Sequence, residues 1–401
     1  MLNSREIQAF LAPEHHDLSK KLVEWSEAHI ATLPIVESDE EARVQAREIL
    51  KRLGESNHIG YAIPSSVGGH QHGVDLRSCV MVRETLGSAN PLADAIFALQ
   101  CLGSMPITLS GNRELQEKWL PAVLRGEAMA AFAMTEFEAG SDVGAITTVA
   151  RKEGEEYVLN GQKAFISNAG IADFYTVFAS TNPSRGRRGL SCFLVEADRP
   201  GLQFTEAQIL SAPHPLGVLQ FESCRIPTSN RIGTEGRGLA LGLATLDSLR
   251  PTVAGAACGM AHRALTEALA HTTTRRQFDQ PLSEFQLVQS QLAEMVLELS
   301  AARLLTYRAA WEHDRGADRI TVEAGMAKAY ATEAAQRIID RSLQLHGGRA
   351  ALAKHPVEHL YRSIRSLRIY EGTTEIQHLI IARHLLDHYR QSSKTPEADT
   401  Q

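Results

Sequence analysis

The sequence has few cysteines, no marked excess of charge of one sign and no long apolar run, and each absence excludes a class of protein. Its five cysteines are an odd number in 401 residues and are widely spaced. They form neither a C-x-x-C pair nor the cysteine–histidine spacing of a zinc site. We therefore expect small buried side chains in a reducing compartment and no metal site.

The charge balance and the N-terminal segment also exclude partners. The 41 basic and 47 acidic residues leave a formal net charge of -6, which gives no electrostatic reason to bind nucleic acid. The first residues lack the apolar core of a signal peptide, and we expect no window to reach the ~18 apolar residues of a membrane span. The sequence thus predicts no nucleic acid, no membrane and, by default, a cytoplasmic location.

The chain is too long for a single small core and divides into regions with different sequence patterns. Residues 1–127 repeat apolar side chains at intervals of three and four, which predicts an all-α N-terminal domain. Residues 128–235 contain short β-branched and aromatic segments separated by turn residues, which predicts a central β domain. Residues 236–390 predict a C-terminal helical bundle, and the polar residues 391–401 predict a disordered tail. The predicted fold class is mainly α with a central β domain, α+β.

Three local patterns make sharper predictions. Asn160-Gly161 suits the type I′ turn of a tight hairpin. Phe165 and Ser167, two residues apart on the outgoing strand, should then lie on the same face. The Ala- and Gly-rich residues 253–261 predict a helix that packs very close to a neighbour.

The most informative segment is RIYEGTTEIQ, which places Glu371 before a glycine and a helix start. Thr374 and Gln377 have the T-x-x-Q spacing of a capping box, so a helix should begin just after Glu371. Gly372 permits backbone angles that other residues avoid. The turn could therefore aim the Glu371 carboxylate into a cavity. Taken alone, however, the segment fits a solvated acidic residue near a positive helix end better.

Four segments, taken in their order along the chain, favour a functional role for Glu371 instead. They are AFAMTEFEAGSD, NGQKAFISNAG, TTTRRQFDQPLSEFQ, and QLHGG followed by YEGTTEIQ. Together they closely resemble the acyl-CoA dehydrogenase family of flavoenzymes, and the similarity runs from about Leu18 to Leu386. The resemblance implies an N-terminal helical domain, a middle β-barrel or sandwich and a C-terminal four-helix bundle. It also implies FAD, held between the last two domains and a neighbouring subunit.

The resemblance further implies roles for single residues. Glu371 would be the catalytic base that takes the α-proton of an acyl-CoA thioester, while the β-hydrogen leaves as hydride to flavin N5 and a trans-2-enoyl-CoA forms. Phe165 would lie against the flavin, and Ser167 would offer its hydroxyl to N5. Arg275 would reach the FAD of the partner subunit, since its planar fork suits a pyrophosphate. The residues implied for FAD are Phe132, Met134, Thr135, Phe165, Ser167, Arg275, Phe278, Gln286, Gln344, Gly347, Gly348, Thr373 and Glu375. Those implied for the substrate are Ser141, Asp247, Arg250, Tyr370 and Gly372.

Several positions depart from the family pattern. Phe137 stands where proline is usual, and Phe165 stands where tryptophan is frequent. Neither change removes a reacting group. His214-Pro215 replaces a basic residue and an R-x-S-like turn, which puts the usual substrate contacts of that loop, and the acyl group accepted, in question. Some members place their base at the position of Leu249, and leucine cannot act as one, so Glu371 is the candidate here.

The implied partners are an acyl-CoA substrate and an electron-transfer flavoprotein, and the implied assembly is a homotetramer, a dimer of dimers. One alternative keeps the fold but lets oxygen reoxidise the flavin, as in acyl-CoA oxidases. Those members tend to be longer, with an extra C-terminal domain, whereas this chain stops soon after the helix of Glu375. Another alternative is a non-catalytic flavin-binding member that binds DNA or a protein, against which Glu371 and the acidic net charge both weigh. Acyl chain length, branching and pathway stay open, because pocket depth depends on packing.

Overall fold

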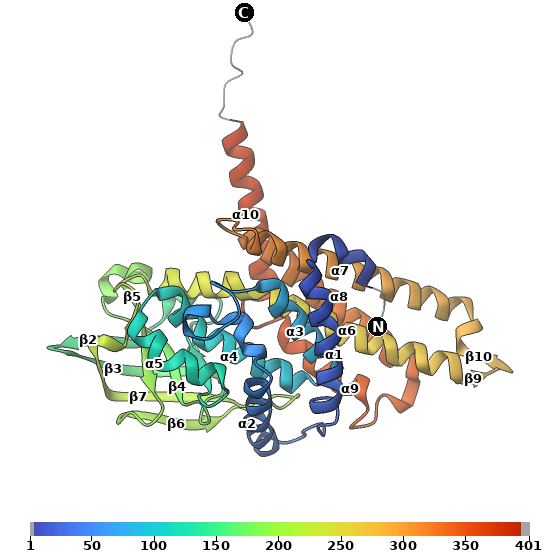
Figure 1. The fold of residues 1–401 in the computed structure, drawn as a ribbon, viewed down its shortest axis with the longest axis horizontal. Helices are drawn as coiled ribbons and strands as arrows, with labels where there is room; N and C mark the ends of the chain where they lie inside the picture. The colour runs from blue at the N-terminus through green and yellow to red at the C-terminus, as the bar shows by residue number, and fades with distance from the viewer. Residues whose placement is uncertain (1–3, 394–401) are drawn as a thin grey trace, which may run out of the picture.

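The computed structural model describes residues 4–393, and the chain runs through a helical region, a β region and a second helical region (Figure 1). The helices of the first region are α1 (Pro13–His29), α2 (Asp39–Glu55), α3 (Leu76–Ala89), α4 (Pro91–Ser110) and α5 (Arg113–Leu124). Those of the last region are α6 (Gly238–Thr274), α7 (Gln286–Asp314), α8 (Thr321–His346), α9 (Pro356–Leu367) and α10 (Thr374–Ser392). The predicted α+β class with a central β region is confirmed.

Side-chain caps explain where several N-terminal helices begin. Ser38 accepts a hydrogen bond from the first turn of α2, Asp75 from that of α3 and Asn112 from that of α5. Asn90 does the same for α4, which continues with Pro91 at its first position. Each cap satisfies a backbone N–H that has no partner inside its own helix. These four polar capping residues therefore determine where the helices begin.

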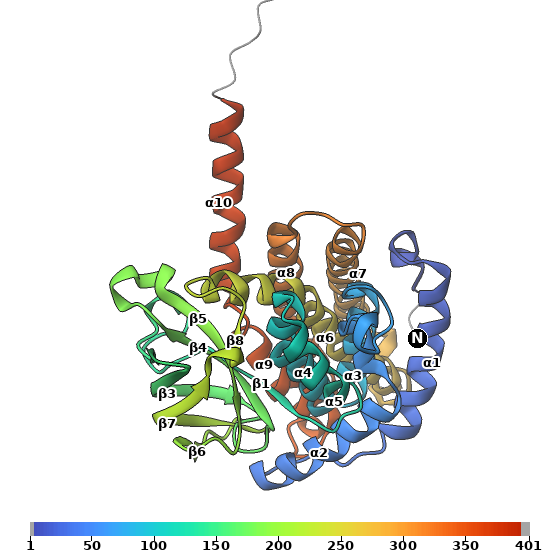
Figure 2. The same ribbon diagram turned by 60° about the vertical axis from the view of Figure 1, so that its left-hand side comes forward.

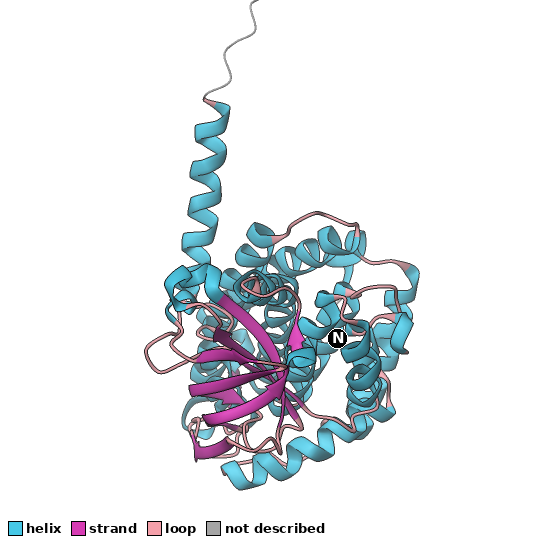
Figure 3. Ribbon diagram, turned by 90° about the vertical axis from the view of Figure 1, so that its left-hand side faces the viewer, coloured by secondary structure: helices cyan, strands magenta, loops and turns pink. Residues whose placement is uncertain are grey.

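The β region forms one eight-stranded mixed sheet on one side of the molecule (Figure 3). Its strands are β1 (Ala130–Ala133), β2 (Val149–Glu153), β3 (Glu156–Ser167), β4 (Phe174–Ser180), β5 (Leu190–Glu196), β6 (Leu202–Ala207), β7 (Leu216–Pro227) and β8 (Arg231–Ile232). The spatial order is β6-β7-β3-β2-β4-β5-β8, and β1 pairs in parallel with β4. β4 is buried along its whole length, whereas the edge strand β6 is mostly exposed.

The predicted hairpin turn at Asn160-Gly161 is wrong, because β3 continues through these residues. The turn that joins β2 to β3 lies at Gly154, which has a φ of 61°. Asn160 instead accepts a hydrogen bond from the backbone of Ser223 at a shift in register between β3 and β7. A Cβ on Gly161 would lie 2.6 Å from Thr148 Oγ1. Glycine therefore allows a β-bulge at a position where Thr148 leaves no room for a side chain.

The close helix packing predicted for residues 253–261 is confirmed at the contact between α6 and α3. A Cβ on Gly259 would lie 1.9 Å from the carbonyl oxygen of Glu84, and one on Gly87 would lie 2.7 Å from that of Ala256. The backbones of the two helices therefore approach as closely as glycine allows. This contact fixes α3 against the C-terminal helices.

The C-terminal helices α6, α7 and α8 pack against one another, and α9 packs on α6 and α8. A short hairpin of β9 (Arg276–Gln277) and β10 (Gln280–Pro281) joins α6 to α7. Only the start of α10 is buried, and Figures 1 and 2 show the rest of this helix extending away from the body. Because α10 ends at Ser392, the predicted disordered tail from residue 391 begins too early. Residues 394–401 of that tail lie outside the described residues.

Buried apolar side chains form three clusters. The first joins the N-terminal helices to one face of the sheet, the second fills the C-terminal helices, and the third covers the other face of the sheet. Phe174 and Phe178 of β4 belong to the first cluster, and Tyr175 and Val177 to the third, as alternation along a strand requires. All five cysteines are buried and free, as predicted: Cys79, Cys101, Cys192, Cys224 and Cys258.

Within residues 4–393 one helix, α4, is long and apolar enough to cross a membrane, contrary to the expectation that no window would be. Its most apolar window of 18 residues has a mean hydropathy of 1.5, but 72% of that window is buried inside the protein. A core helix passes the same test of length and composition, so the window is weak evidence for a membrane span.

Candidate active site

Glu371 lies on the turn between α9 and α10. Its φ of 54° is rare for a residue with a side chain and costs of order 1–3 kcal/mol. The predicted helix start just after Glu371 is confirmed, but the capping residue lies one position earlier than expected. Thr373 Oγ1 accepts a hydrogen bond from Ile376 N at 3.3 Å, and Thr374 is the first residue of α10. Thr373 and Glu375 therefore lie at the start of α10, next to Glu371.

The backbone carbonyls of this turn are held from three helices. Arg250 of α6 donates from Nε to the carbonyl oxygen of Glu371 at 3.1 Å. Lys328 of α8 donates from Nζ to the carbonyl oxygen of Gly372 at 2.8 Å. Gln377 of α10 donates from Nε2 to both oxygens, at 3.3 and 3.1 Å. The turn is thus fixed through its main chain, and its carboxylate is left free.

The Glu371 carboxylate is a shielded acceptor. Although the residue as a whole is half-buried, its Oε2 is out of contact with solvent and has no hydrogen-bond partner in residues 4–393. Burial raises the pKa of Glu371, and the positive charges of Arg83, Arg250 and Lys328 oppose that rise, while Asp94 adds to it. The carboxylate therefore binds a proton more strongly than an exposed glutamate, as a general base requires.

A buried ion pair lies beside Glu371. Arg83 of α3 and Asp94 of α4 have side chains that are each 1% exposed, and they make two hydrogen bonds, of 2.7 and 2.9 Å. Arg83 also donates from Nη1 to Thr252 Oγ1 at 3.0 Å, and its positive charge acts on Tyr370, the residue before Glu371. Asp94 and Tyr370 line one small cavity of about 40 Å³. Neither Arg83 nor Asp94 was predicted.

The residues predicted for the substrate are only partly brought together. Asp247 and Arg250 form an ion pair one turn apart on α6, and Asp247 also accepts a hydrogen bond from Thr321 Oγ1 at 2.7 Å. Through Arg250 this pair reaches the Glu371 turn, which also contains Tyr370 and Gly372. Ser141 is exposed on the loop after β1, and no described contact brings it to this group.

The β region contributes a second group of predicted residues. Phe132 of β1 packs its ring on the core. The carbonyl oxygen of Met134 accepts a hydrogen bond from Lys163 Nζ at 3.0 Å, and that of Thr135 accepts one from Ala164 N at 3.0 Å. The end of β1 is therefore tied to the part of β3 that leads into Phe165.

Phe165 lies in an irregular part of β3. It has a φ of 57°, and the register with β7 shifts at this point. Ile166 is buried between the more exposed Phe165 and Ser167, which fits the predicted common face of these two residues. Its backbone N–H donates to Gln208 Oε1 at 2.7 Å. The ring is 52% exposed and meets Phe137 edge to face at 5.7 Å. An exposed aromatic ring held in this way can stack on a planar ligand.

Ser167 faces the loop that departs from the family pattern. Its Oγ lies 3.2 Å from Nε2 of His214. Burial lowers the pKa of His214 to about 4, so its imidazole is neutral at neutral pH. The unusual loop thus contacts a predicted FAD residue.

The other predicted FAD residues lie elsewhere on the chain. The β9–β10 hairpin, which contains Phe278 and follows Arg275, lies at the end of the molecule opposite the large sheet (Figure 1). Stacking of His271 on His346, with ring centres 4.4 Å apart, joins the ends of α6 and α8 there. The residues of this group are Arg275, Phe278, Gln286, Gln344, Gly347 and Gly348. A single chain does not bring them to Phe165.

This second surface fits a ligand or a neighbouring subunit. The Phe278 ring is 88% exposed, and a Cβ on Gly347 or Gly348 would meet open space. Gly347 has a φ of 62°, which glycine adopts without strain. An exposed arginine, an exposed aromatic ring and an open glycine backbone suit the pyrophosphate and the ring system of a dinucleotide.

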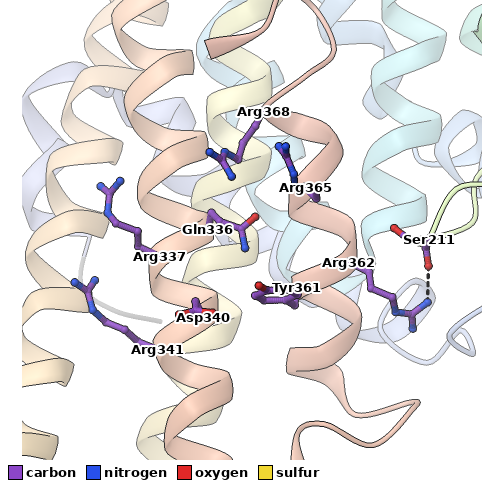
Figure 4. Close-up of a pocket in the computed structure, with 9 residues that line it drawn as sticks. All are labelled: Ser211, Gln336, Arg337, Asp340, Arg341, Tyr361, Arg362, Arg365 and Arg368. Carbon is purple, nitrogen blue, oxygen red and sulfur yellow. Dashed lines mark hydrogen bonds between the residues drawn. The ribbon is translucent and has the colours of Figure 1, made fainter. Parts of the chain in front are cut away.

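A separate hollow of about 550 Å³ opens between α8 and α9 (Figure 4). It is lined by Ser211, Gln336, Arg337, Asp340, Arg341, Tyr361, Arg362, Arg365 and Arg368. Four of these arginines already pair with carboxylates, as Arg362 does with Glu358 at 2.6 and 2.9 Å. None of the predicted site residues lines this hollow, so it is not the candidate active site. Within residues 4–393, no three His, Cys, Asp or Glu residues gather as a metal site would require.

Three family models match successive parts of the chain. They describe the acyl-CoA dehydrogenase N-terminal domain at residues 12–127, the middle domain at 131–224 and the C-terminal domain at 236–386. This chain belongs to the acyl-CoA dehydrogenase family. It is therefore an oxidoreductase of a family that dehydrogenates acyl-CoA thioesters, and its family neighbours are FAD-dependent flavoproteins.

Relatives of this acyl-CoA dehydrogenase family member span nearly its whole length. A 3-(aryl)acrylate reductase of Clostridium sporogenes is 37% identical over 377 residues, which is 93% of this chain and 99% of the relative. A probable acyl-CoA dehydrogenase of Mycobacterium tuberculosis is 37% identical over 380 residues, covering 94% and 97%. The structure of butyryl-CoA dehydrogenase from Megasphaera elsdenii matches with a TM-score of 0.87 at 30% identity, covering 94% and 99%.

The sequence did not point to several residues that hold the Glu371 turn of this acyl-CoA dehydrogenase family member. The T-x-x-Q spacing predicts Gln377 as half of a capping box, whereas in the structure its amide donates to two carbonyl oxygens of the turn. Lys328 and Arg83 lie in helices far from Glu371 in the sequence. The one available signal was a positive charge among apolar helix residues, as in the segment LRSCVMVRETLG, which contains Arg83.

Proposed function

We propose that this enzyme removes one hydrogen from the α-carbon and one from the β-carbon of an acyl-CoA thioester, with Glu371 as base, and releases a trans-2-enoyl-CoA. One observation carries the proposal. Glu371 presents a solvent-shielded carboxylate oxygen without a partner among the described residues, on a turn whose carbonyls are clamped by Arg250, Lys328 and Gln377. A group buried in this way is costly to keep unless a ligand uses it.

In this proposal Glu371 takes the α-proton. The α-proton of a thioester is only weakly acidic, so a carboxylate with an ordinary pKa would be a poor base for it. Burial raises the pKa of Glu371, and a bound substrate that expels water acts in the same direction. The proton passes to the Glu371 carboxylate, the electron pair of that C–H bond forms the new double bond, and the β-hydrogen leaves with its own pair. FAD, when bound, supplies the acceptor for that hydride at N5.

Two sets of residues would hold FAD. Phe132, Met134, Thr135, Phe165 and Ser167 of the β region, with Thr373 and Glu375 of α10, would meet the flavin of their own subunit. The second set would meet the FAD of a neighbour and consists of Arg275, Phe278, Gln286, Gln344, Gly347 and Gly348. The exposed Phe165 and Phe278 rings and the open space above the two glycines support this division.

We further propose a homotetramer, a dimer of dimers, in the cytoplasm. Large apolar side chains stand exposed on two helices of the C-terminal region: Leu287 and Leu297 on α7, and Leu385 and Tyr389 on α10. Because α10 leaves the body of the chain, its apolar side chains have no cover in the described part of a single subunit (Figure 2). Burial against other subunits would remove this surface from water.

The proposed electron acceptor is an electron-transfer flavoprotein, and the alternative is oxygen. One solved neighbour, a prolyl acyl carrier protein oxidase, has a TM-score of 0.85 at 30% identity, and this similarity supports the alternative that oxygen is the acceptor. The two readings separate in one measurement. If the reduced enzyme consumes oxygen at the rate of turnover, the oxidase reading holds. If it needs an electron-transfer flavoprotein, the dehydrogenase reading holds.

Anaerobic mixing tests the reaction itself. The FAD-loaded enzyme is mixed with straight, branched, cyclic and aromatic acyl-CoAs, and the flavin absorbance is followed. We expect at least one thioester to bleach it within the mixing experiment and to yield the enoyl product. If no thioester in the panel bleaches the flavin, the proposed activity is wrong.

A further inference from the structure

The buried Arg83–Asp94 pair has no part in the mechanism described so far. Both side chains are 1% exposed and are held by two hydrogen bonds. Taking two charges out of water is costly, and an apolar pair of similar size is often equally stable or more so. Stability alone therefore does not explain why a charged pair of this kind lies next to the proposed base.

The position of Arg83 is rigidly fixed. Its guanidinium is shared between Asp94 and Thr252 on α6. Its helix, α3, is held against α6 at Gly259, where no side chain would fit. Asp94 and Tyr370 line the same small cavity, so the pair lies next to the residue before Glu371. Arg83 thus places a permanent positive charge near the base.

Charged and titratable groups face Glu371 from every helix packed around it. They are Arg83 on α3, Asp94 and Cys101 on α4, Arg250 and its partner Asp247 on α6, Lys328 on α8, and Tyr370 on the turn itself. Arg250 is paired with Asp247, and burial lowers the pKa of Lys328 to about 8. Among the cations, Arg83 stabilises the ionised Glu371 most, and Asp94 opposes it. The electrostatic balance at the base thus depends on this pair.

We propose that the Arg83–Asp94 pair positions Glu371 and sets its proton affinity: Arg83 keeps the carboxylate ionised in a water-free turn, and Asp94 limits this effect so that the carboxylate still accepts a proton. The inference rests on the proposed role of Glu371 as base. In this arrangement Arg83 and Asp94 are positioning residues that act through Glu371 and Tyr370 and need not touch the substrate. Their effect is therefore visible in the titration of Glu371.

Two single substitutions should move this titration in opposite directions. Arg83→Met removes the positive charge and keeps only the unbranched stem of the side chain, so Glu371 should hold its proton to a pH about one unit higher than in the parent enzyme. Asp94→Asn removes the negative charge and leaves Arg83 in place, so the midpoint should fall. The double variant Arg83→Met/Asp94→Asn leaves no buried unpaired charge. Its midpoint should rise, but by less than that of Arg83→Met.

The midpoint is read in two ways on the FAD-loaded enzyme. Infrared difference spectra between each variant and its Glu371→Gln counterpart follow the carboxyl stretch of Glu371 against pH without any substrate. Rapid mixing with one reactive acyl-CoA follows the acid limb of flavin reduction. The matched control is Arg77→Met, since Arg77 lies on the same helix and pairs with Asp314 at 2.7 Å, away from Glu371. It should leave both midpoints unchanged.

The outcomes separate this inference from the proposed function. Opposite shifts for Arg83→Met and Asp94→Asn support it, even if no thioester reduces the flavin. Unchanged midpoints in both variants, or a shift in the same direction in both, would overturn it even if acyl-CoA reduces the flavin normally. If Arg83→Met does not fold, the Asp94→Asn and double variants decide. A shift in Arg77→Met as large as that in Arg83→Met would show a non-local effect and would also reject the inference.

Discussion

The ammonium group of Lys328 donates a hydrogen bond of 2.8 Å to the carbonyl oxygen of Gly372, next to the proposed base. Lys328 is fully buried on α8, and the Gln377 amide reaches the same oxygen from α10 at 3.1 Å. Because these donors take up the main chain of the turn, they leave the Glu371 side chain without a competing hydrogen bond. The turn is thus held through its backbone, which leaves its side chain free for the proposed reaction.

Gln377→Leu should hold the Glu371 carboxylate less firmly in position. Leucine keeps most of the volume but cannot donate to the carbonyl oxygens of Glu371 and Gly372. We expect FAD binding to persist and the rate of flavin reduction by a good acyl-CoA to fall about tenfold, which corresponds to ~1.4 kcal/mol of lost transition-state stabilisation. Flavin content by absorbance and single-turnover reduction measure the two effects. A normal reduction rate would mean that the amide does not position the base.

Glu371→Gln should bind FAD and acyl-CoA but fail to reduce the flavin. The amide keeps the shape of the carboxylate and loses its basicity, so the loss should appear in the reduction rate rather than in the affinity for substrate. Equilibrium titration with acyl-CoA and anaerobic stopped-flow absorbance separate the two quantities. Near-normal reduction in this variant would identify another residue as the base.

The same substitution should make the folded protein more stable at neutral pH. Burial raises the pKa of Glu371, so the folded protein loses stability as the pH rises from the ordinary carboxyl value through the raised one. Glutamine does not ionise, so the variant does not lose folding stability in this way as the pH rises. Thermal unfolding of both proteins across that range should give a higher Tm for Glu371→Gln, with a difference that grows with pH. A difference that is constant with pH would rule out ionisation of Glu371 as its cause.

The sequence predicted those parts of the fold and site that depend on local pattern or on matched motifs. The helix start after Glu371, the tight helix of residues 253–261 and the central β region all follow from spacing, and the structure confirms them. Asn160-Gly161 was assigned wrongly, because the same dipeptide that forms a tight turn also suits a bulge in a continuous strand. Only the pairing partner, β7, decides between them.

The contacts around Glu371 could not be predicted, because they join distant segments. Arg83, Arg250, Lys328 and Glu371 lie on four different elements, and no periodicity in one segment shows that they meet. The capping residue was placed one position late for a similar reason. Thr374 donates to Glu333 of α8 at 2.7 Å, and this tertiary contact leaves Thr373 to cap α10.

Gly259→Ala should destabilise the protein. The added Cβ would lie 1.9 Å from the backbone oxygen of Glu84, so α3 and α6 would have to move apart. Overpacking of this kind costs about 1–3 kcal/mol, and a lower Tm should report it. Gly73→Ala is the matched control, because a Cβ at Gly73 meets nothing within 4 Å. Equal unfolding temperatures for the two variants would contradict the close contact.

Arg275 should serve the cofactor of a neighbouring subunit, and complementation between two inactive variants can test this. Arg275→Ala should lose FAD, while Arg276→Ala, a change at the adjacent exposed arginine, should keep it. After subunit exchange between Arg275→Ala and Glu371→Gln, a mixed dimer contains one site with an intact base from the first chain and an intact arginine from the second. Activity should return to that site.

No such recovery is possible if Arg275 contacts the FAD of its own chain, because each site would then retain one defect. The β9–β10 hairpin lies at the opposite end of the molecule from the sheet that contains Phe165, so a shared site between subunits is the arrangement that uses both groups (Figure 1). The measurement is thioester-dependent flavin reduction in the mixture, compared with each variant alone carried through the same exchange. A mixture no more active than its components would assign Arg275 to its own subunit.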